Sequence, residues 1–162
     1  MAVHFHKLKV KEVRTETPDC VSIAFVVPKD LQSEFLFEQG QNITIKKEID
    51  GEEIRRSYSI CSAPFENELR VAVKKVDGGK FSGFANSILK AGDELDVLPP
   101  TGKFNTKLII QNAKQYLAFA AGSGITPVIS IIKTTLQTEP ASRFTLVFGN
   151  RLEFYFLVVN QD

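Results

Sequence analysis

Residues 42–60, NITIKKEIDGEEIRRSYSI, decide the fold of the larger part of this chain. Two β-rich runs, 42–49 and 52–60, flank the pair Asp50-Gly51, which is the strongest short signal for a β-hairpin turn. Four more runs of the same kind lie at 7–15, 21–27, 68–76 and 94–98. Six short strands spaced in this way predict an antiparallel barrel with Greek-key connections.

A brief helix is predicted beside these strands, over residues 82–90, SGFANSILK. Ser82 is suited to be its N-cap, because a serine hydroxyl can accept a hydrogen bond from an amide of the first turn. Phe84, Ile88 and Leu89 form its apolar face. A glycine follows the predicted end of the helix, as is common at helix C-termini.

The pattern changes after the last of these strands. Residues 115–121, QYLAFAA, form a continuous apolar run that is typical of a strand buried on both faces. A glycine turn and a helical pattern over 125–136 follow, and 143–148 form a second apolar run. These segments predict a βαβ unit, the beginning of a parallel α/β domain. We therefore divide the chain into a barrel domain, 1–110, and a partial nucleotide-binding α/β domain, 111–162.

The predicted α/β unit is unfinished, because the residues after it read as one more apolar strand, LEFYFLVVNQD, with no helix behind it. A doubly wound nucleotide-binding domain needs several βαβ units. A single unit leaves strand edges open and one face of its sheet uncovered. We therefore expect a truncated domain that forms a homodimer, or swaps strands, through its exposed sheet edges.

Composition and charge exclude several classes of protein. A formal net charge of +1 argues against nucleic-acid binding, because a phosphate backbone calls for a concentrated basic face. No apolar run is long enough to span a membrane, and the first residues lack the apolar core of a signal peptide, so we expect a cytoplasmic protein. Cys20 and Cys61 alone cannot supply the four thiolates of an iron–sulfur cluster, and no metal-ligand spacing is present.

The first candidate motif is Arg56-Ser57-Tyr58-Ser59, at the end of a predicted barrel strand. Because side chains alternate along a strand, Arg56 and Tyr58 share one face. A cation and an aromatic ring two residues apart suit a ligand that is part anion and part flat ring. The same four residues also fit an ordinary strand with a solvated arginine, so this motif by itself decides nothing.

The second motif, Gly78-Gly79-Lys80-Phe81-Ser82, opens the short helix. Glycines at this place let the backbone approach a ligand, and the first amides of the helix, aided by its dipole, favour an anion such as pyrophosphate. Lys80 and the hydroxyl of Ser82 could add to this attraction. A hairpin turn followed by an N-cap is the other interpretation.

The third motif is AAGSGITP, residues 120–127, at the junction between the apolar strand and the amphipathic helix. Its two glycines permit a tight turn, and its proline suits the first turn of a helix. A lone Gly-x-Gly is a weak signal, but the carboxyl end of a parallel strand is where α/β sheets bind nucleotides.

The order of these motifs, RSYS, GGKFS, AGSGITP and then VFGNR, resembles the ferredoxin-NADP⁺-reductase superfamily. Among its branches, the chain is most similar to the reductase components of phenylacetyl-CoA ring-epoxidase systems, which serve phenylacetate degradation. The resemblance covers residues from about 5 to 151. It implies an FAD-binding barrel followed by an NAD(P)-binding domain. The implied activity is hydride transfer from NAD(P)H to FAD, followed by one-electron transfers to an iron–sulfur acceptor or oxygenase component.

The resemblance also implies roles for individual residues. Tyr58 would stack on the flavin, Ser59 would bond near flavin N5, and Arg56 would pair with the pyrophosphate. The other implied FAD contacts are Ser57, Ala72, Val73, Lys74, Gly79, Lys80, Phe81 and Ser82, with Ser123 and Thr126 lying between flavin and nicotinamide. The implied nicotinamide-nucleotide contacts are Gly122, Gly124, Asn150 and Arg151. No side chain is needed as a catalytic acid or base.

Two other functions stay open. One is a remnant that keeps the fold, and with it FAD binding or dimerisation, but has lost turnover because its nicotinamide site is incomplete. The other is a small β-barrel, unrelated to flavin, that uses its groove for a different ligand. The flavin interpretation requires Tyr58 and the backbone at 80–82 to converge on one extended cofactor.

Overall fold

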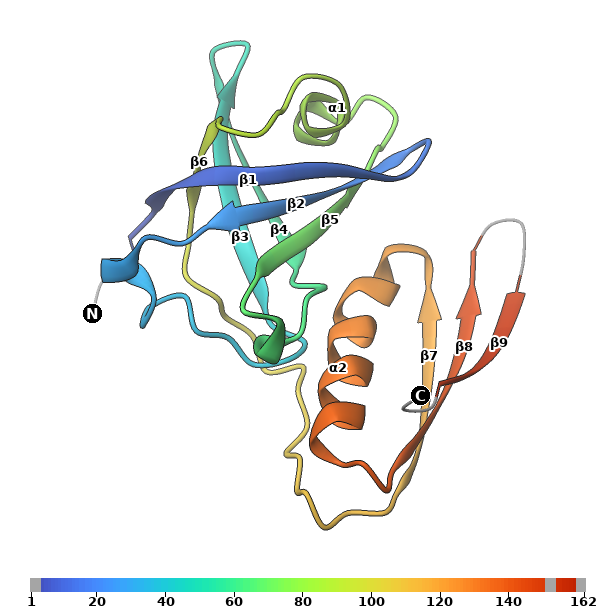
Figure 1. The fold of residues 1–162 in the computed structure, drawn as a ribbon. Coiled ribbons are helices and arrows are strands. Elements are labelled where there is room, and N and C mark those ends of the chain that lie inside the picture. The colour runs from blue at the N-terminus through green and yellow to red at the C-terminus, as the bar shows by residue number, and fades with distance from the viewer. Residues whose placement is uncertain (1–3, 151–153, 160–162) are drawn as a thin grey trace.

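The computed structural model describes residues 4–150 and 154–159, which form a β-barrel and a smaller α/β module (Figure 1). The six barrel strands are antiparallel and hydrogen-bonded in the order β4-β3-β6-β1-β2-β5, with β6 inserted between β3 and β1. They are β1 (His6–Thr17), β2 (Cys20–Val26), β3 (Asn42–Ile49), β4 (Glu52–Ser59), β5 (Leu69–Lys74) and β6 (Glu94–Val97), with the 3₁₀ turns η1 (Lys29–Leu31) and η2 (Pro64–Glu66) between them. This confirms the predicted six-stranded antiparallel barrel.

The β3–β4 hairpin turns where the sequence predicts it. Asp50 and Gly51 have φ angles of 53° and 75°, and two successive positive values are what a two-residue type I′ turn requires. The two strands then pair along their whole length without a register shift. The hairpin therefore sets which side chains of RSYS face the barrel interior and which face outward.

One backbone bridge closes the barrel. The strands β4 and β5 stand at the two ends of the strand order, and the isolated bridge Ile60↔Val71 joins the chain just beyond β4 to β5. The amide of Cys61 also donates to the carbonyl of Arg70 at 2.9 Å. Among the residues that the structure describes, no ladder pairs β4 with β5, so the seam between these strands is open beyond Ile60.

The interior of the barrel is filled by branched aliphatic side chains that alternate inward along the strands. Ten of them are at most 1% exposed: Leu8, Val10, Ile23, Ile43, Ile45, Ile60, Val71, Val73, Leu95 and Val97. Since each fully buried side chain of this size contributes about 1.5–3 kcal/mol, this cluster is the main source of the barrel's stability.

The helix α1 (Lys80–Ser87) packs against the barrel, but it differs from the predicted helix over 82–90. It begins two residues earlier, with Gly79 in extended conformation as its N-cap, so Ser82 lies inside the first turn and is not the cap. Ile88 lies past the helix end and is 67% exposed, whereas Phe81 is 1% exposed. The prediction of the cap was therefore wrong, because the chain already enters the helix at Lys80. Of the predicted apolar face, Phe84 and Leu89 pack on the barrel core and Ile88 does not.

The second module is a three-stranded sheet with one helix. Its elements are β7 (Gln115–Ala121), the 3₁₀ turn η3 (Gly122–Gly124), α2 (Ile125–Thr138), β8 (Arg143–Gly149) and β9 (Phe154–Val159). β7 and β8 run parallel and β9 returns antiparallel beside β8, in the order β7-β8-β9. The predicted βαβ unit and the additional strand are thus confirmed. Helix α2 lies between the barrel and this sheet (Figure 1).

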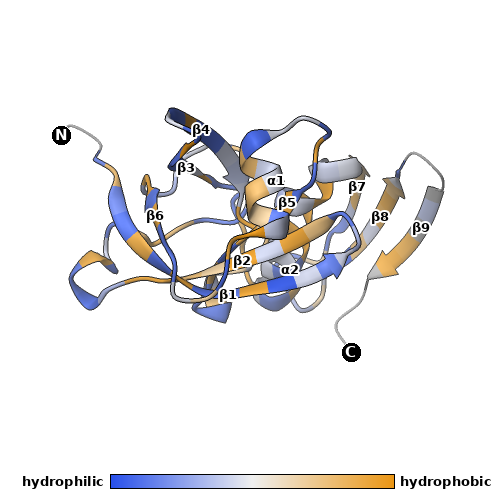
Figure 2. Ribbon diagram, turned by 90° about the horizontal axis from the view of Figure 1, so that it is seen from above, coloured by the Kyte–Doolittle hydropathy of each residue, from blue (hydrophilic) through white to orange (hydrophobic). Residues whose placement is uncertain are grey.

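The strand β7 is not buried on both faces, contrary to the prediction from its apolar run. α2 covers one face through Val128, Ile132 and Leu136, but Leu117 and Phe119 on the other face are 58% and 72% exposed. Figure 2 shows hydrophobic stretches on all three strands of this sheet. The module supplies only one covering helix among its described residues, so the second apolar face stays bare.

Glu139, at the end of α2, is a buried structural carboxylate that no sequence motif singled out. Its side chain accepts hydrogen bonds from the amide of Ile109 (3.0 Å), Asn112 Nδ2 (2.6 Å), the Tyr116 hydroxyl (2.8 Å) and Ser142 Oγ (2.9 Å). Burial alone would raise the pKa of Glu139, but these bonds outweigh it and hold the pKa at about 2. The carboxylate thereby ties the segment between the modules to the end of α2.

We predict that Glu139→Gln lowers the free energy of unfolding by about 1–3 kcal/mol near neutral pH, because the new amide group meets the existing donors. The folded-state pKa of about 2 lies below the ordinary value of 4.5, so the stabilisation by the carboxylate is complete above that value and is lost as pH falls toward 2. Urea unfolding near neutral pH and near pH ~3 should show the difference between the two proteins shrinking. Glu48→Gln, at an exposed site, is the control; an equal loss there would contradict the prediction.

At Gly40 the segment that leaves the barrel passes close to the barrel backbone. Its φ is +84°, and a Cβ atom at this position would lie 1.8 Å from the carbonyl oxygen of Phe104 and 3.2 Å from Ile131 Cδ1 of α2. The neighbouring Gln39 donates from Nε2 to the carbonyl of Thr106 at 2.8 Å. Only a glycine leaves room for the backbone of the departing segment here.

We predict that Gly40→Ala destabilises the protein by about 2 kcal/mol or more, because a backbone atom would have to move. Gly51→Ala is the matched control, since Gly51 also has a positive φ but nothing lies within 4 Å of the added Cβ. Its cost should be about 1 kcal/mol, from the left-handed backbone alone. Thermal unfolding of both variants measures the difference, and equal destabilisation would contradict the steric argument.

Candidate functional site

The end of β4 and the first turn of α1 meet at two aromatic rings. The centroids of Tyr58 and Phe81 are 5.6 Å apart, with the rings tilted by 35°. Phe81 is buried, and Tyr58 is half-buried on top of it, so one part of the Tyr58 side chain remains accessible. Burial raises the pKa of Tyr58 to about 12, although the nearby Arg56 opposes the shift, so the phenol stays neutral at physiological pH. The end of β4 and the first turn of α1 are therefore in contact, as the flavin interpretation requires.

The other residues of RSYS divide between two sides of the strand. Arg56 is exposed, and within the described residues its guanidinium donates to the neighbouring carbonyl of Arg55 at 2.7 Å. Ser57 lies on the opposite side, where its hydroxyl is hydrogen-bonded to that of Thr44 at 2.8 Å. The structure therefore groups Arg56 with Tyr58 and separates Ser57 from them, as strand alternation predicts.

The open seam of the barrel exposes a strand edge next to Tyr58. Residues 72–74 of β5 pair with β2 on one side, and the described residues provide no strand partner on the side toward β4 beyond the Ile60–Val71 bridge. Ala72 is half-buried and Val73 is fully buried, while Lys74 is exposed and 3.2 Å from Asp19. The carbonyl of Val73 already accepts from Asn86 Nδ2 of α1 at 3.1 Å, so only the remaining main-chain groups of this edge can serve a ligand.

The turn before α1 needs Gly79. A Cβ there would lie 2.4 Å from Ser82 Oγ and 3.0 Å from the carbonyl of Val76. Ser82 Oγ accepts from the Val76 amide (3.1 Å) and donates to the Gly79 carbonyl (3.2 Å), so its hydroxyl shapes the turn. Lys80 forms an ion pair with Glu52 at the start of β4. The first amides of α1 lie at a helix N-terminus, where backbone donors and the dipole favour an anion.

These features fit a dinucleotide that carries a flat ring system and a pyrophosphate. The half-buried ring of Tyr58 and the unpaired edge of β5 suit the planar part, while the N-terminus of α1 with Lys80 and Arg56 suits the anionic part. No described side chain near the seam forms an acid–base pair of the kind that hydrolytic catalysis requires.

The glycine turn of the second module lies at the carboxyl end of β7. Gly122 has a φ of +51°, and Thr126 Oγ1 donates to the carbonyl of Ser123 at 2.9 Å, which fixes the start of α2. Asn150 is exposed directly after β8, the strand paired with β7. Arg151 lies outside the described residues.

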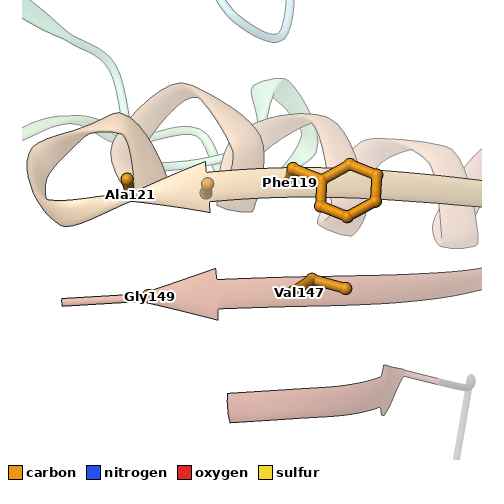
Figure 3. Close-up of a pocket in the computed structure, with 5 residues that line it drawn as sticks. Phe119, Ala121, Val147 and Gly149 are labelled. Carbon is orange, nitrogen blue, oxygen red and sulfur yellow. The ribbon is translucent and has the colours of Figure 1, made fainter. Parts of the chain in front are cut away.

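A hollow of about 240 Å³ opens at this end of the small sheet, lined by Phe119, Ala120, Ala121, Val147 and Gly149 (Figure 3). The side chains of Phe119 and Val147 lie next to each other on adjacent strands, as their register requires. Neither residue was predicted from the sequence, although parallel pairing of 115–121 with 143–148 would have placed them on one face. A larger hollow of about 390 Å³, lined by Leu36, Phe37, Glu38 and Gln41, contains none of the predicted residues.

Comparison with known families agrees with this geometry. The pattern of the family described as "Oxidoreductase FAD-binding domain" matches residues 7–106, well over half of the chain. The chain belongs to this family. A second pattern, "Oxidoreductase NAD-binding domain", matches residues 119–161. The predicted membership of the ferredoxin-reductase-like oxidoreductases, with FAD and nicotinamide-nucleotide domains, is thereby confirmed.

This FAD-binding oxidoreductase chain has well-matched relatives. It is 50% identical over 147 residues to a component of the 1,2-phenylacetyl-CoA epoxidase of Escherichia coli (strain K12), covering 91% of this chain and 41% of the relative. It is 39% identical to the ferredoxin reductase component of 3-ketosteroid-9-alpha-monooxygenase of Rhodococcus rhodochrous, covering 90% and 41%. The structure of phthalate dioxygenase reductase is similar with a TM-score of 0.70 and 28% identity, covering 91% of this chain and 44% of that one. The chain spans about two fifths of the length of these relatives.

No described helix combines the length and the apolar character needed to cross a bilayer.

We predict that Tyr58→Ala weakens FAD binding about tenfold, because the accessible ring that would pack on the flavin is removed. Tyr58→Phe keeps the ring and should bind FAD within about twofold of the wild type, since the phenol donates no hydrogen bond that the stacking depends on. Titration of the apoprotein with FAD, followed by flavin fluorescence, measures both. Equal affinity in all three proteins would mean that the flavin does not contact this ring.

Proposed function

We propose that the chain is the flavin module of an NAD(P)H-dependent reductase, which delivers electrons to an iron–sulfur or oxygenase component in cytoplasmic phenylacetate degradation. The observation that carries the proposal is the convergence of Tyr58, Phe81 and the first amides of α1 beside the open seam of the barrel. The assignment to phenylacetate degradation is supported by the name and 50% identity of the Escherichia coli relative.

When bound, FAD would supply the redox chemistry by accepting two electrons as a hydride from NAD(P)H and releasing them one at a time. The residues of this chain would bind and orient it. Tyr58 would pack on the ring system, and the free main-chain groups of residues 72–74 would meet its polar edge. Arg56 and the amides at the start of α1 would hold the pyrophosphate, with Lys80, which is paired with Glu52, beside them.

The nicotinamide side of the site is proposed for the second module. Ser59 would bond near flavin N5, with Ser123 and Thr126 facing it from the glycine turn. Gly122 and Gly124 would let the nicotinamide nucleotide approach the backbone, and Asn150 would contact it from the end of β8. Support for this part is the position of the turn at the carboxyl ends of two parallel strands.

The purified chain tests the proposal directly. Incubation with FAD and removal of the excess should leave a yellow protein with flavin absorption, and anaerobic addition of NADH or NADPH should bleach it. A chain that stays colourless after this treatment contradicts the proposed function. Tyr58→Ala should retain less flavin under the same conditions.

A second candidate is a dimerising FAD-binding remnant without turnover. It is supported by the bare face of the small sheet, where Leu117 and Phe119 are more than half exposed and the edge of β7 is unpaired among the described residues. Pairing of two β7 edges, or contact between two such faces, would remove this apolar surface from water.

The two candidates give opposite results in one pair of measurements. The remnant predicts a concentration-dependent dimer in sedimentation equilibrium, which Phe119→Glu disrupts, and no bleaching of bound FAD by NADH or NADPH. Normal bleaching by a monomeric chain rules the remnant out.

A further inference from the structure

Helix α2 touches the barrel on the side that faces away from β7 and β8. The hydroxyl of Ser130 donates to the carbonyl of Ser62 at 2.7 Å, and both residues are buried, at 0% and 2% exposure. This bond connects residues 68 positions apart in the chain and joins the two modules. A buried hydrogen bond has strict limits of distance and angle, so it fixes the sliding and rotation of the helix in a way that apolar contact does not.

The acceptor of this bond is itself held rigidly by the barrel. Ser62 Oγ donates to the carbonyl of Glu68 at 2.6 Å and accepts from the amide of Arg70 at 3.2 Å. Cys61, one residue earlier, is bonded through its amide to the carbonyl of Arg70. The Ser62 carbonyl is therefore part of the closure of the barrel, not of a mobile loop.

Two further contacts flank the bond along α2. Lys133 Nζ lies 2.9 and 3.3 Å from the two carboxylate oxygens of Glu66, which also accepts from the amide of Ala63 at 2.7 Å. Ile131 reaches the site where Gly40 has no side chain. The ion pair is partly exposed, so by itself it stabilises the contact little. It is a second polar contact between α2 and the barrel, beside the buried bond.

These contacts lie close in the chain to two residues of the proposed cofactor site. Ser62 follows Ser59 by three residues in the continuation of β4, and Ser130 follows Thr126 by four residues, one turn along the same face of α2. In the proposed function, Ser59 and Thr126 face the flavin. The Ser130–Ser62 bond therefore lies three residues along the chain from Ser59 and one helical turn from Thr126.

We propose that the Ser130–Ser62 hydrogen bond, oriented by the Lys133–Glu66 ion pair, is a latch that positions the glycine turn 122–126 against the flavin end of β4. Ser130 is accordingly a positioning residue that touches neither cofactor nor substrate. The effect on catalysis rests on the proposed function, whereas the effect on module orientation does not.

Module orientation is measured by residual dipolar couplings of backbone amides in the full chain. In the wild type, couplings from β1–β6 and from α2 with β8 should fit one alignment tensor. In the double variant Ser130→Ala/Lys133→Met the tensor of the small module should shrink about twofold relative to that of the barrel, because contacts that hold the two modules together are lost. A single shared tensor in the double variant overturns the proposal.

Matched variants separate the latch from general destabilisation. Thr134→Val removes a hydroxyl whose bond, as far as the described part of the chain shows, stays within α2, to the Ser130 carbonyl at 2.7 Å, and should leave one shared tensor. Ser130→Thr keeps the hydroxyl and should restore the orientation. Lys133→Met changes an exposed residue that cannot prevent folding, so a partial effect is expected even if the Ser130→Ala chain is poorly folded.

In kinetic measurements, loss of the Ser130 hydroxyl should affect the rate of flavin reduction and not the affinity for FAD. In Ser130→Ala the Kd for FAD should stay within about twofold of the wild type, while the rate of flavin reduction at saturating NADH falls about tenfold, because the two reacting groups are less well aligned. Restoration of that rate by Ser130→Thr supports positioning. A shared tensor that depends on Ser130 in a chain whose bound FAD is never reduced supports the latch and contradicts the proposed function.

Discussion

The backbone bridge between Ile60 and Val71 is the constraint on which the rest of the structure depends. It joins the two ends of the strand order and so turns a six-stranded sheet into a barrel. On one side of the bridge β4 and β5 separate and leave the open seam with Tyr58. On the other side the chain continues into Ser62, whose carbonyl receives the hydroxyl of α2. One closure point therefore serves both the proposed cofactor site and the contact between modules.

A buried arginine, Arg70, lies next to this bridge in β5. Arg70, only 7% exposed, forms ion pairs with Glu68 and Glu12, and its guanidinium donates to Ser22 Oγ at 2.7 Å. Burial would lower the pKa of Arg70, but the bonds to Glu68 and Glu12 outweigh it and keep the charge fixed. Of the three charged groups in this network only the arginine is buried, since the side chains of Glu12 and Glu68 are 49% and 24% exposed. Its bonds join side chains of β1, β2 and β5.

The two modules differ in how completely their apolar surface is covered. The barrel surrounds its own core, and α1 packs against it. The small sheet has one face under α2 and the other exposed, and its helix is held from both sides, by Val128, Ile132 and Leu136 toward the sheet and by Ser130 toward the barrel. Contact with the barrel thus compensates in part for the small core of the second module.

The sequence by itself determined the barrel, the hairpin at Asp50-Gly51, the βαβ order and the grouping of Arg56 with Tyr58, because these follow from local turn chemistry and from the period of strands and helices. Only the tertiary structure decided the start of α1, the exposure of Phe119, the burial of Glu139 and the bond from Ser130 to Ser62. Each of these depends on which distant segment lies alongside, and residues far apart in sequence carry no local signal of their partner. An apolar run such as QYLAFAA is compatible with a strand that is buried on both faces. Whether another element covers each face depends on the tertiary structure.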